Sequence, residues 1–310
     1  MTVTGRVESG ELGLVLAHEH VMASFQPYAQ WVNDPTPYDR NEVVAVMLPY
    51  LQRIQALGCR TFVDATAAYL GRDPMVLRTL AQRTGMNILT TTGAYAADEH
   101  RHVPTYVSDG TPDSVAEQWI REWHEGLDGT GIKPGFIKIG FNGRPLSRVE
   151  DTLIRAAAIA HRQTGLTIGA HTGPAVAAMA QLQILNELKI DPSAWIWIHA
   201  QNEPDDSKLI EAARRGAWIE LDGVRSEDIA TYIARVRNMR DAGLLNRVLL
   251  SQDSGWYHIG EPRGGEVHSY DVILTGFIPA LRSAGFSQDE IDGLFVRNPA
   301  EAFSIRARVA

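Results

Sequence analysis

The 310-residue chain lacks several features that assign proteins to large classes. Its only cysteine is Cys59, which excludes an intrachain disulfide. The chain has no run of about 18 apolar residues, the length that a membrane-spanning helix needs. Its first residues lack the basic segment and apolar core of a signal peptide. We therefore expect a cytoplasmic protein that does not associate with membranes.

A basic surface is missing as well. The chain has 29 Lys and Arg residues against 37 Asp and Glu residues, a net charge of -8, and no run of basic residues. Proteins that bind nucleic acid need a positive stripe to neutralise phosphates, so nucleic acid is not an expected partner. The expected partner is a small-molecule substrate.

Linkers are also absent, since no low-complexity tract or segment rich in Ser and Gly divides the chain. Hydrophobic residues make up 45% of the sequence, enough for a large core. Because α/β barrels of this length commonly form one unit, we predict a single domain over residues 1–310.

What the chain has is a regular alternation of short apolar runs, which predict buried strands, and amphipathic segments, which predict helices. Eight strands that alternate with helices are typical of a (β/α)8 TIM barrel in the α/β class. About twenty residues follow the third strand without a pattern, and loops that long tend to be functional, so we expect this one to cover a site. A second long loop is expected from residue 254 to about 267. The predicted strands are residues 14–20, 60–65, 87–92, 136–141, 167–171, 195–200, 217–222 and 247–253.

The first predicted strand ends in Ala-His-Glu-His. Side chains alternate along a strand, so His18 and His20 point the same way and Glu19 points to the other face. Two imidazoles in this arrangement can hold one metal ion. The simpler interpretation is that two polar residues leave a buried strand for solvent.

Later strands weaken that simpler interpretation, because four more residues of metal-binding type end apolar runs: Lys138, His171, His199 and Asp253. In a barrel the carboxyl ends of the strands meet at one rim, where catalytic residues lie. His171 and His199 follow neighbouring strands and are predicted to hold a second ion. Each alone is also compatible with a satisfied core histidine.

Lys138 is the most informative of these residues. Alternation places it on one face with Phe136 and Gly140, and an unpaired ammonium that faces a barrel interior is unfavourable. Pairing with a carboxylate such as Asp253 is one solution. The other is that the amine, made neutral by burial, reacts with carbon dioxide and becomes a carbamate that bridges two metal ions.

Asp253 can bind a metal through one oxygen and accept a proton from water through the other. Two ions about 3.5 to 4 Å apart lower the pKa of a bridging water to near neutrality, and the hydroxide can then attack an ester or lactone. Imidazole suits zinc, cobalt, iron and nickel, and oxygen ligands add manganese. We expect two divalent ions, with zinc as the first candidate.

These motifs resemble the metal signature of the phosphotriesterase family, which lies within the amidohydrolase superfamily and includes phosphotriesterase-like lactonases. The resemblance runs from about Leu14 to Phe303, where Asn-Pro-Ala-Glu-Ala-Phe is similar to the family's closing helix motif. Dimers are common in the family, so a homodimer is compatible with the resemblance. The resemblance implies that His18, His20 and Asp253 bind the more buried metal. It implies that His171 and His199 bind the more exposed metal and that carboxylated Lys138 bridges the two.

The family's loops select among lactones, sugar-lactone phosphates, phosphotriesters, amides and carboxylic esters. Tyr95 stands where lactonases of the family have a tyrosine near the substrate oxygen, which implies a catalytic role beside Asp253. Arg225, in the loop after the seventh strand, is a second candidate for substrate binding. Both are also compatible with ordinary surface residues.

The loop after the eighth strand offers Trp256, His258 and Arg263 for substrate binding. Such donors suit a hydroxyl, carboxylate or phosphate group, unless Arg263 only pairs with Glu261 in solvent. We therefore predict a binuclear-metal hydrolase, a lactonase with a polar or anionic substrate. A phosphotriesterase or an amidase on the same metal centre is the alternative.

Two further functions fit the sequence less well. A barrel that binds metal or ligand without turnover, as a sensor or scaffold, would carry a damaged ligand position, and none is visible. A deaminase-like enzyme of the same superfamily, with one metal, would have no lysine bridge. Lys138 argues against it.

Overall fold

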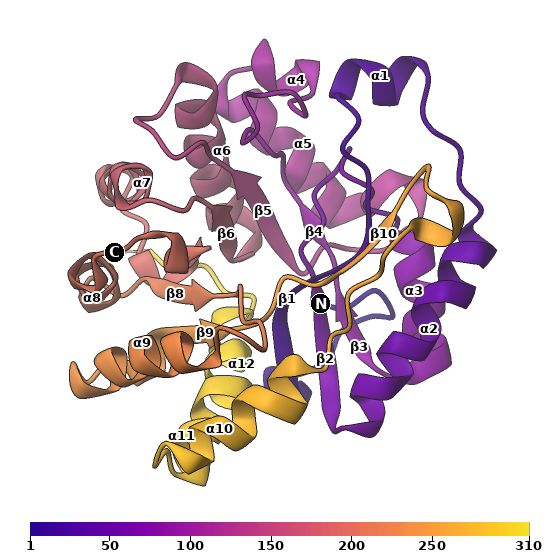
Figure 1. The fold of residues 1–310 in the computed structure, drawn as a ribbon. Coiled ribbons are helices and arrows are strands. Elements are labelled where there is room, and N and C mark those ends of the chain that lie inside the picture. Colours follow the sequence, from indigo (N-terminus) through magenta and orange to yellow (C-terminus); the bar gives the residue numbers. More distant parts are fainter. Residues whose placement is uncertain (310) are drawn as a thin grey trace.

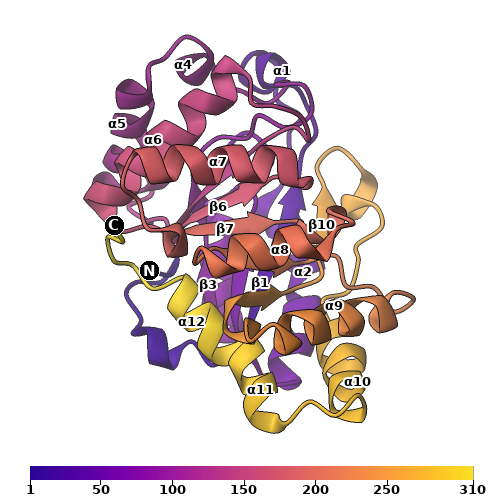
Figure 2. The same cartoon turned by 90° about the vertical axis from the view of Figure 1, so that its left-hand side faces the viewer.

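The computed structural model describes residues 1–309. Parallel strands form the wall of a barrel in the middle of the molecule, and helices surround it, as Figure 1 shows. In Figure 2 the helices α7, α8 and α9 lie side by side outside the strands. The predicted α/β barrel in a single domain is confirmed.

The strands follow one another around the barrel in chain order, each parallel to the next. The ladder is interrupted at Thr90, so β3 and β4 together make the third barrel strand. Hydrogen bonds from β1 to the residues after β9 close the ring. The barrel strands are β1 (Leu14–Ala23), β2 (Cys59–Asp64), β3 (Asn87–Leu89), β4 (Thr91–Thr92), β5 (Phe136–Gly140), β6 (Ile168–His171), β7 (Trp195–Ile198), β8 (Trp218–Leu221) and β9 (Val248–Leu250).

The helices mostly begin where a capping side chain satisfies free backbone N–H groups. Before α6, for example, the Ser147 side chain accepts from the Glu150 N–H while the Glu150 side chain accepts from the Ser147 N–H. The helices are α1 (Tyr28–Asn33), α2 (Arg40–Ala56), α3 (Pro74–Thr84), α4 (Thr105–Ser108), α5 (Pro112–Glu125), α6 (Arg148–Thr164), α7 (Ala175–Glu187), α8 (Asp206–Arg214), α9 (Ile229–Asp241), α10 (Ile278–Ser283), α11 (Gln288–Asp292) and α12 (Asn298–Ala302).

Two segments predicted as loops contain secondary structure. The segment after β4 includes α4, and the segment after β9 includes a further strand, β10 (Gly255–His258), which pairs in parallel with the end of β1. Gly255 permits this pairing because its φ is 103° and a Cβ there would lie 1.9 Å from the His20 carbonyl oxygen. The run Gly-Trp-Tyr-His is too short to show a period, so no strand signal is visible in this segment.

The barrel interior has an apolar layer at the amino-terminal ends of the strands and ionisable residues above it. Alternating positions of the strands point inward, and the apolar ones pack together. This packed layer supports the residues of the rim. Its members include Val15, Val63, Leu89, Phe136, Ile196, Trp218, Leu249 and Phe303.

Within residues 1–309, none of the helices combines the length and the apolar character needed to cross a bilayer.

Phe136→Ala is expected to lower the free energy of unfolding by about 3 to 5 kcal/mol, because it leaves a cavity in this layer. Phe136 is 1% exposed and its ring packs against Phe303 at 5.4 Å between centroids. Urea denaturation measures the loss. Val176→Ala, at a residue 49% exposed on α7, is the control and should change stability by less than about 0.5 kcal/mol. Equal losses in the two variants would contradict the assigned core.

Candidate metal centre

A cavity of about 220 Å³ opens at the carboxyl ends of the strands. The side chains of metal-binding type around it come from β1, β5, β6 and the turns after β7 and β9. The structure thus brings together residues that are far apart in the sequence, at the rim where a barrel enzyme carries its chemistry. All six predicted ligands line it: His18, His20, Lys138, His171, His199 and Asp253.

A β-bulge turns both histidines of β1 toward the cavity. The register between β1 and β2 shifts after Leu16, so Ala17 and His18 together lie opposite Val63. Ala17 packs inside the barrel, and strict alternation would therefore send His18 outward. The extra residue brings His18, and with it His20, to the inner face. Alternation predicts that the two histidines point the same way, but it does not predict the bulge.

The hydrogen bonds of His20 leave one ring nitrogen free for a metal. Its Nδ1 lies 2.8 Å from the Thr66 hydroxyl, which itself donates to the Met22 carbonyl oxygen at 3.4 Å, so Nδ1 is the donor. Nε2 therefore carries a lone pair, and it faces Asp253 Oδ1 at 3.0 Å. Two acceptors this close need a cation between them, which can be a proton or a metal ion.

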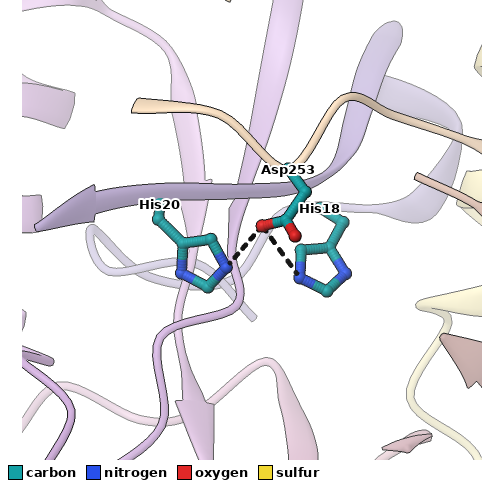
Figure 3. A group of neighbouring side chains, drawn as sticks. All are labelled: His18, His20 and Asp253. Carbon is teal, nitrogen blue, oxygen red and sulfur yellow. Dashed lines mark ion pairs between the residues drawn. The ribbon is translucent and has the colours of Figure 1, made fainter. Parts of the chain in front are cut away.

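Asp253 reaches the cavity from the turn after β9, and Figure 3 shows its carboxylate between the rings of His18 and His20. Its Oδ1 is buried and accepts no hydrogen bond from the described part of the chain. Burial opposes ionisation, but the contact with His20 and the nearby His18 hold the pKa of Asp253 well below its usual range. The φ of Asp253 is 48°, in the left-handed region, so the turn is strained.

His199 reaches the cavity through a strained backbone too. It follows the inward-facing Ile198, so an extended conformation would turn it outward, but its φ of 61° turns it in. Its Nδ1 donates to Asp222 Oδ1 at 2.7 Å, which leaves Nε2 free. The ring of His171, at the end of β6, lies beside it with 4.3 Å between centroids. Burial, helped by His199 and Lys138, holds the pKa of His171 well below its usual range, so it is neutral.

Lys138 lies beneath the histidines, with its Nζ 3.3 Å from His18 Nε2. Among the described residues it forms no ion pair, so the simpler interpretation of Lys138 as half of a salt bridge finds no support. Burial lowers its pKa, although the carboxylates of Glu220 and Asp253 oppose this. A lowered pKa favours the neutral amine, the form that reacts with carbon dioxide.

Two buried acids, Glu220 on β8 and Asp222 after it, are functional residues that sequence reasoning missed. The Nδ1 of His18 lies 3.1 Å from Glu220 Oε2 and 3.2 Å from Asp222 Oδ2, so these acids orient His18 as Asp222 orients His199. Burial and the charge of Asp222 raise the pKa of Glu220 well above its usual range, whereas the two imidazoles lower that of Asp222 despite burial. The signal was present: Trp-Ile-Glu-Leu-Asp places two acids on one face of an apolar strand.

Tyr95 lines the cavity. Its hydroxyl is 3.2 Å from His171 Nε2, and its ring covers Gly140, where a Cβ would lie 2.4 Å from the ring. Gly140 must therefore remain a glycine. Burial and the charge of Asp253 raise the pKa of Tyr95, so the hydroxyl keeps its proton.

Trp256 also lines the cavity and stacks on His20 with 3.9 Å between centroids. Its φ is 71°, and its indole N–H donates to the Asp253 carbonyl oxygen at 3.1 Å. Trp256 thus lies at the cavity, while substrate binding by it stays a prediction.

The other three residues predicted to bind substrate lie outside the cavity walls. The guanidinium of Arg225 donates to the backbone carbonyls of Gln252 and Asp253 instead. His258 lies beside Phe25, with 6.0 Å between ring centroids, and Arg263 lines a separate surface hollow. Long side chains reach several positions from one loop, so the sequence did not determine where these groups point. The prediction of an anionic substrate rested on these side chains, and none of them lines the cavity.

The long segment after β4 covers the site, as its length predicted, and it supplies Asp98 and His102 in addition to Tyr95. His102 is buried and its Nε2 lies 3.3 Å from Asp98 Oδ2. Phe25 and Leu70 complete the apolar part of the wall. No pattern in the sequence distinguishes these residues from other loop positions.

The donor set fits two divalent metals. His18, His20 and Asp253 offer ligand atoms within 4.8 Å of one another. Burial and the nearby Lys138 lower the pKa of His18 to about 3, which keeps the imidazole neutral as a metal ligand must be. His171 and His199, side by side, suit a second ion.

Comparisons with known proteins point the same way. The chain matches the model of the Phosphotriesterase family over residues 1–303. A phosphotriesterase homology protein from Escherichia coli (strain K12) is 30% identical over 295 residues, 94% of this chain and 98% of the relative. An N-acetyltaurine hydrolase from Mus musculus is 28% identical, over 97% of this chain and 96% of the relative. A solved structure, described as organophosphate hydrolysis engineered from a weak promiscuous lactonase template, has a TM-score of 0.86 at 30% identity and covers 98% of this chain and 99% of its own.

Asp222→Asn is expected to weaken metal binding by about 10- to 100-fold, because an amide cannot accept from both His18 and His199 as the carboxylate does. Competition with a chelator, followed by metal analysis, measures the affinity. Asp205→Asn is the matched control: Asp205 caps α8 away from the cavity, and Asn caps a helix equally well. Equal metal affinity in both variants would remove Asp222 from its orienting role.

Proposed function

The chain belongs to the phosphotriesterase family of metal-dependent hydrolases, and on this premise we propose that it is a lactonase that opens a small, neutral lactone at a two-metal centre. The observation that carries the proposal is the convergence of six ligand-type side chains on one cavity. Free Nε2 lone pairs and an unpartnered carboxylate oxygen face one another there.

Each residue has a distinct role in the proposal. His18, His20 and Asp253 would hold one ion, His171 and His199 the other, and Lys138, as a carbamate, would bridge both. When bound, the ions supply an acidified water and polarise the scissile carbonyl. The buried acids Glu220 and Asp222 keep the imidazoles turned so that the Nε2 atoms face the cavity.

Asp253 and Tyr95 handle protons in this proposal. Asp253 is ionised and lies at the cavity, so its carboxylate can accept the proton released as water attacks the carbonyl carbon. The Tyr95 hydroxyl keeps its proton and can donate a hydrogen bond to an oxygen of the lactone.

The size and the lining of the cavity favour a small and uncharged substrate. Its volume of about 220 Å³ is below the roughly 300–1,000 Å³ typical of pockets for drug-sized ligands. Within residues 1–309, Lys138 is the only Lys or Arg in the lining, so an anionic substituent finds no free cation. Phe25, Leu70 and Trp256 offer apolar contact to a short acyl chain.

Hydrolysis of a phosphotriester is the second candidate, because phosphotriesters are also uncharged. The related solved structure is described as organophosphate hydrolysis activity engineered from a lactonase template. An amide such as the one in the name of the mouse relative is the third. N-acetyltaurine carries a sulfonate, for which the described cavity wall provides no cation.

A substrate screen on metal-analysed enzyme tests the proposal. The panel holds lactones of short and long chain, sugar-lactone phosphates, aryl esters, N-acetyltaurine and a chromogenic phosphotriester. We expect about two ions per chain and the highest kcat/KM on a short, neutral lactone. A higher kcat/KM on the phosphotriester or the amide would replace the proposed activity with that one.

Lys138→Ala tests the carbamate bridge. The variant should lose bound metal and activity together, and added short carboxylic acids should restore part of both, because a free carboxylate can occupy the place of the carbamate. Metal analysis and rates with and without acetate measure this. Lys208→Ala, at an exposed position of α8, is the control. A Lys138→Ala enzyme that retains two tightly bound ions would exclude the bridge.

A further inference from the structure

Glu19 is a buried acid that the proposed chemistry does not use. It separates the two histidines in the sequence but lies on the opposite face of β1, with 0% of its surface exposed. Among the described residues it has no ion-pair partner, and only neutral donors hold its carboxyl group. A carboxyl group buried without a cation is unfavourable for folding, which points to a requirement other than stability.

The side-chain hydrogen bonds of Glu19 all come from one short turn after β9. Oε1 accepts from the Ser251 hydroxyl at 2.7 Å and from the Gln252 N–H at 3.2 Å. Oε2 accepts from the Ser254 N–H at 2.8 Å. The residue between these donors is Asp253, whose carboxylate faces the cavity (Figure 3).

This turn needs external support. A left-handed backbone at a residue other than glycine costs about 1–3 kcal/mol and persists only where the surroundings determine it, and Asp253 has a φ of 48°. Backbone hydrogen bonds to β1 hold one side: the Asp253 N–H donates to the His18 carbonyl at 3.1 Å, and the His20 N–H donates to the Ser254 carbonyl at 3.0 Å. The Glu19 side chain accepts from the Gln252 and Ser254 N–H groups, which these backbone bonds do not use.

Ser251 links the carboxylate of Glu19 to a predicted metal ligand. Its hydroxyl oxygen accepts from the His18 N–H at 3.0 Å and its hydrogen goes to Glu19. The backbone of β1 and the turn that carries Asp253 therefore meet at one hydroxyl group, and a change at Glu19 reaches both.

We propose that Glu19 is a positioning residue: its carboxylate fixes the Ser251–Ser254 turn in the conformation that aims Asp253 at the metal centre. The proposal rests on the proposed function through the role of Asp253 alone. Glu19 touches neither metal nor substrate, so it acts only through the geometry of the turn.

Glu19→Gln is the direct test, because glutamine has the same shape but places an NH2 group where one oxygen accepts from an N–H. We expect kcat to fall about 10- to 100-fold with little change in KM, in the range typical when a group that orients a metal ligand is lost. A chelator should also remove metal from the variant faster than from the wild type. A crystal structure of the variant should show the Asp253 carboxylate displaced.

Glu150→Gln is a matched control. Glu150 is also a carboxyl group with 0% exposure and three neutral donors, the Asn142 N–H at 2.7 Å, the Ser147 N–H at 2.8 Å and the Asn142 side-chain amide at 3.0 Å. It lies outside the cavity walls, so its variant should lose thermal stability and keep kcat and metal content.

The outcomes separate the possible roles of Glu19. A Glu19→Gln enzyme with wild-type kcat, chelator sensitivity and Asp253 position overturns the proposal, as does a fall in kcat that Glu150→Gln reproduces. If Glu19→Gln does not fold, Ser251→Ala, which removes one of the three donors, should show the same changes to a smaller degree, and unchanged kcat in it also overturns the proposal.

Asp253→Asn distinguishes a failure of this inference from a failure of the proposed function. If Asp253→Asn retains kcat, Asp253 is not the proton acceptor and the proposed function fails at that step. If Asp253→Asn loses kcat while Glu19→Gln retains it, the positioning role alone is wrong.

Discussion

The site depends on hydrogen-bond acceptors that face one another and need a cation between them. The Nδ1 atom of His18 donates to Glu220, that of His20 to Thr66, and that of His199 to Asp222. The Nε2 lone pairs of the three rings therefore turn toward the cavity. There one of them meets an oxygen of Asp253, another acceptor, at 3.0 Å. Acceptors that face one another at this distance repel unless a cation lies between them, so the orienting side chains make the centre complementary to metal before any metal is bound.

Irregular backbone turns ligand residues toward the site. Below the rim, apolar side chains at inward positions of the strands fill the barrel. At the rim, a bulge at Ala17 and His18 and left-handed residues at His199 and Asp253 break the alternation. The bulge and the conformation of His199 each turn a ring inward that a regular strand would turn outward, and the turn at Asp253 lies beside them in a strained conformation.

This division explains how much the sequence could predict. Apolar runs, their alternation with helices and the residue type that ends each run predicted the barrel and the set of residues that converge, because those depend on local pattern alone. The bulge and the left-handed residues depend on contacts between strands, which no single segment reveals. Glu220 and Asp222 carried a visible signal, two acids on one face of an apolar strand. The family resemblance predicts Arg225 at the substrate and the donors of the eighth loop predict Arg263 there, but a long side chain can reach several positions, and these two lie outside the cavity.

The position that Arg225 actually takes shows why this turn is so constrained. Its guanidinium holds the carbonyl groups of Gln252 and Asp253, while the carboxylate of Glu19 holds the N–H groups of Gln252 and Ser254. The backbone around Asp253 is thus bound through its carbonyls by the guanidinium of Arg225 and through its N–H groups by the side chain of Glu19. The other part of the cavity wall comes from the segments before α1 and after β4, which supply Phe25, Asp98 and His102. In the proposed function, the turn at Asp253 would serve the chemistry and these loop segments would contact the substrate.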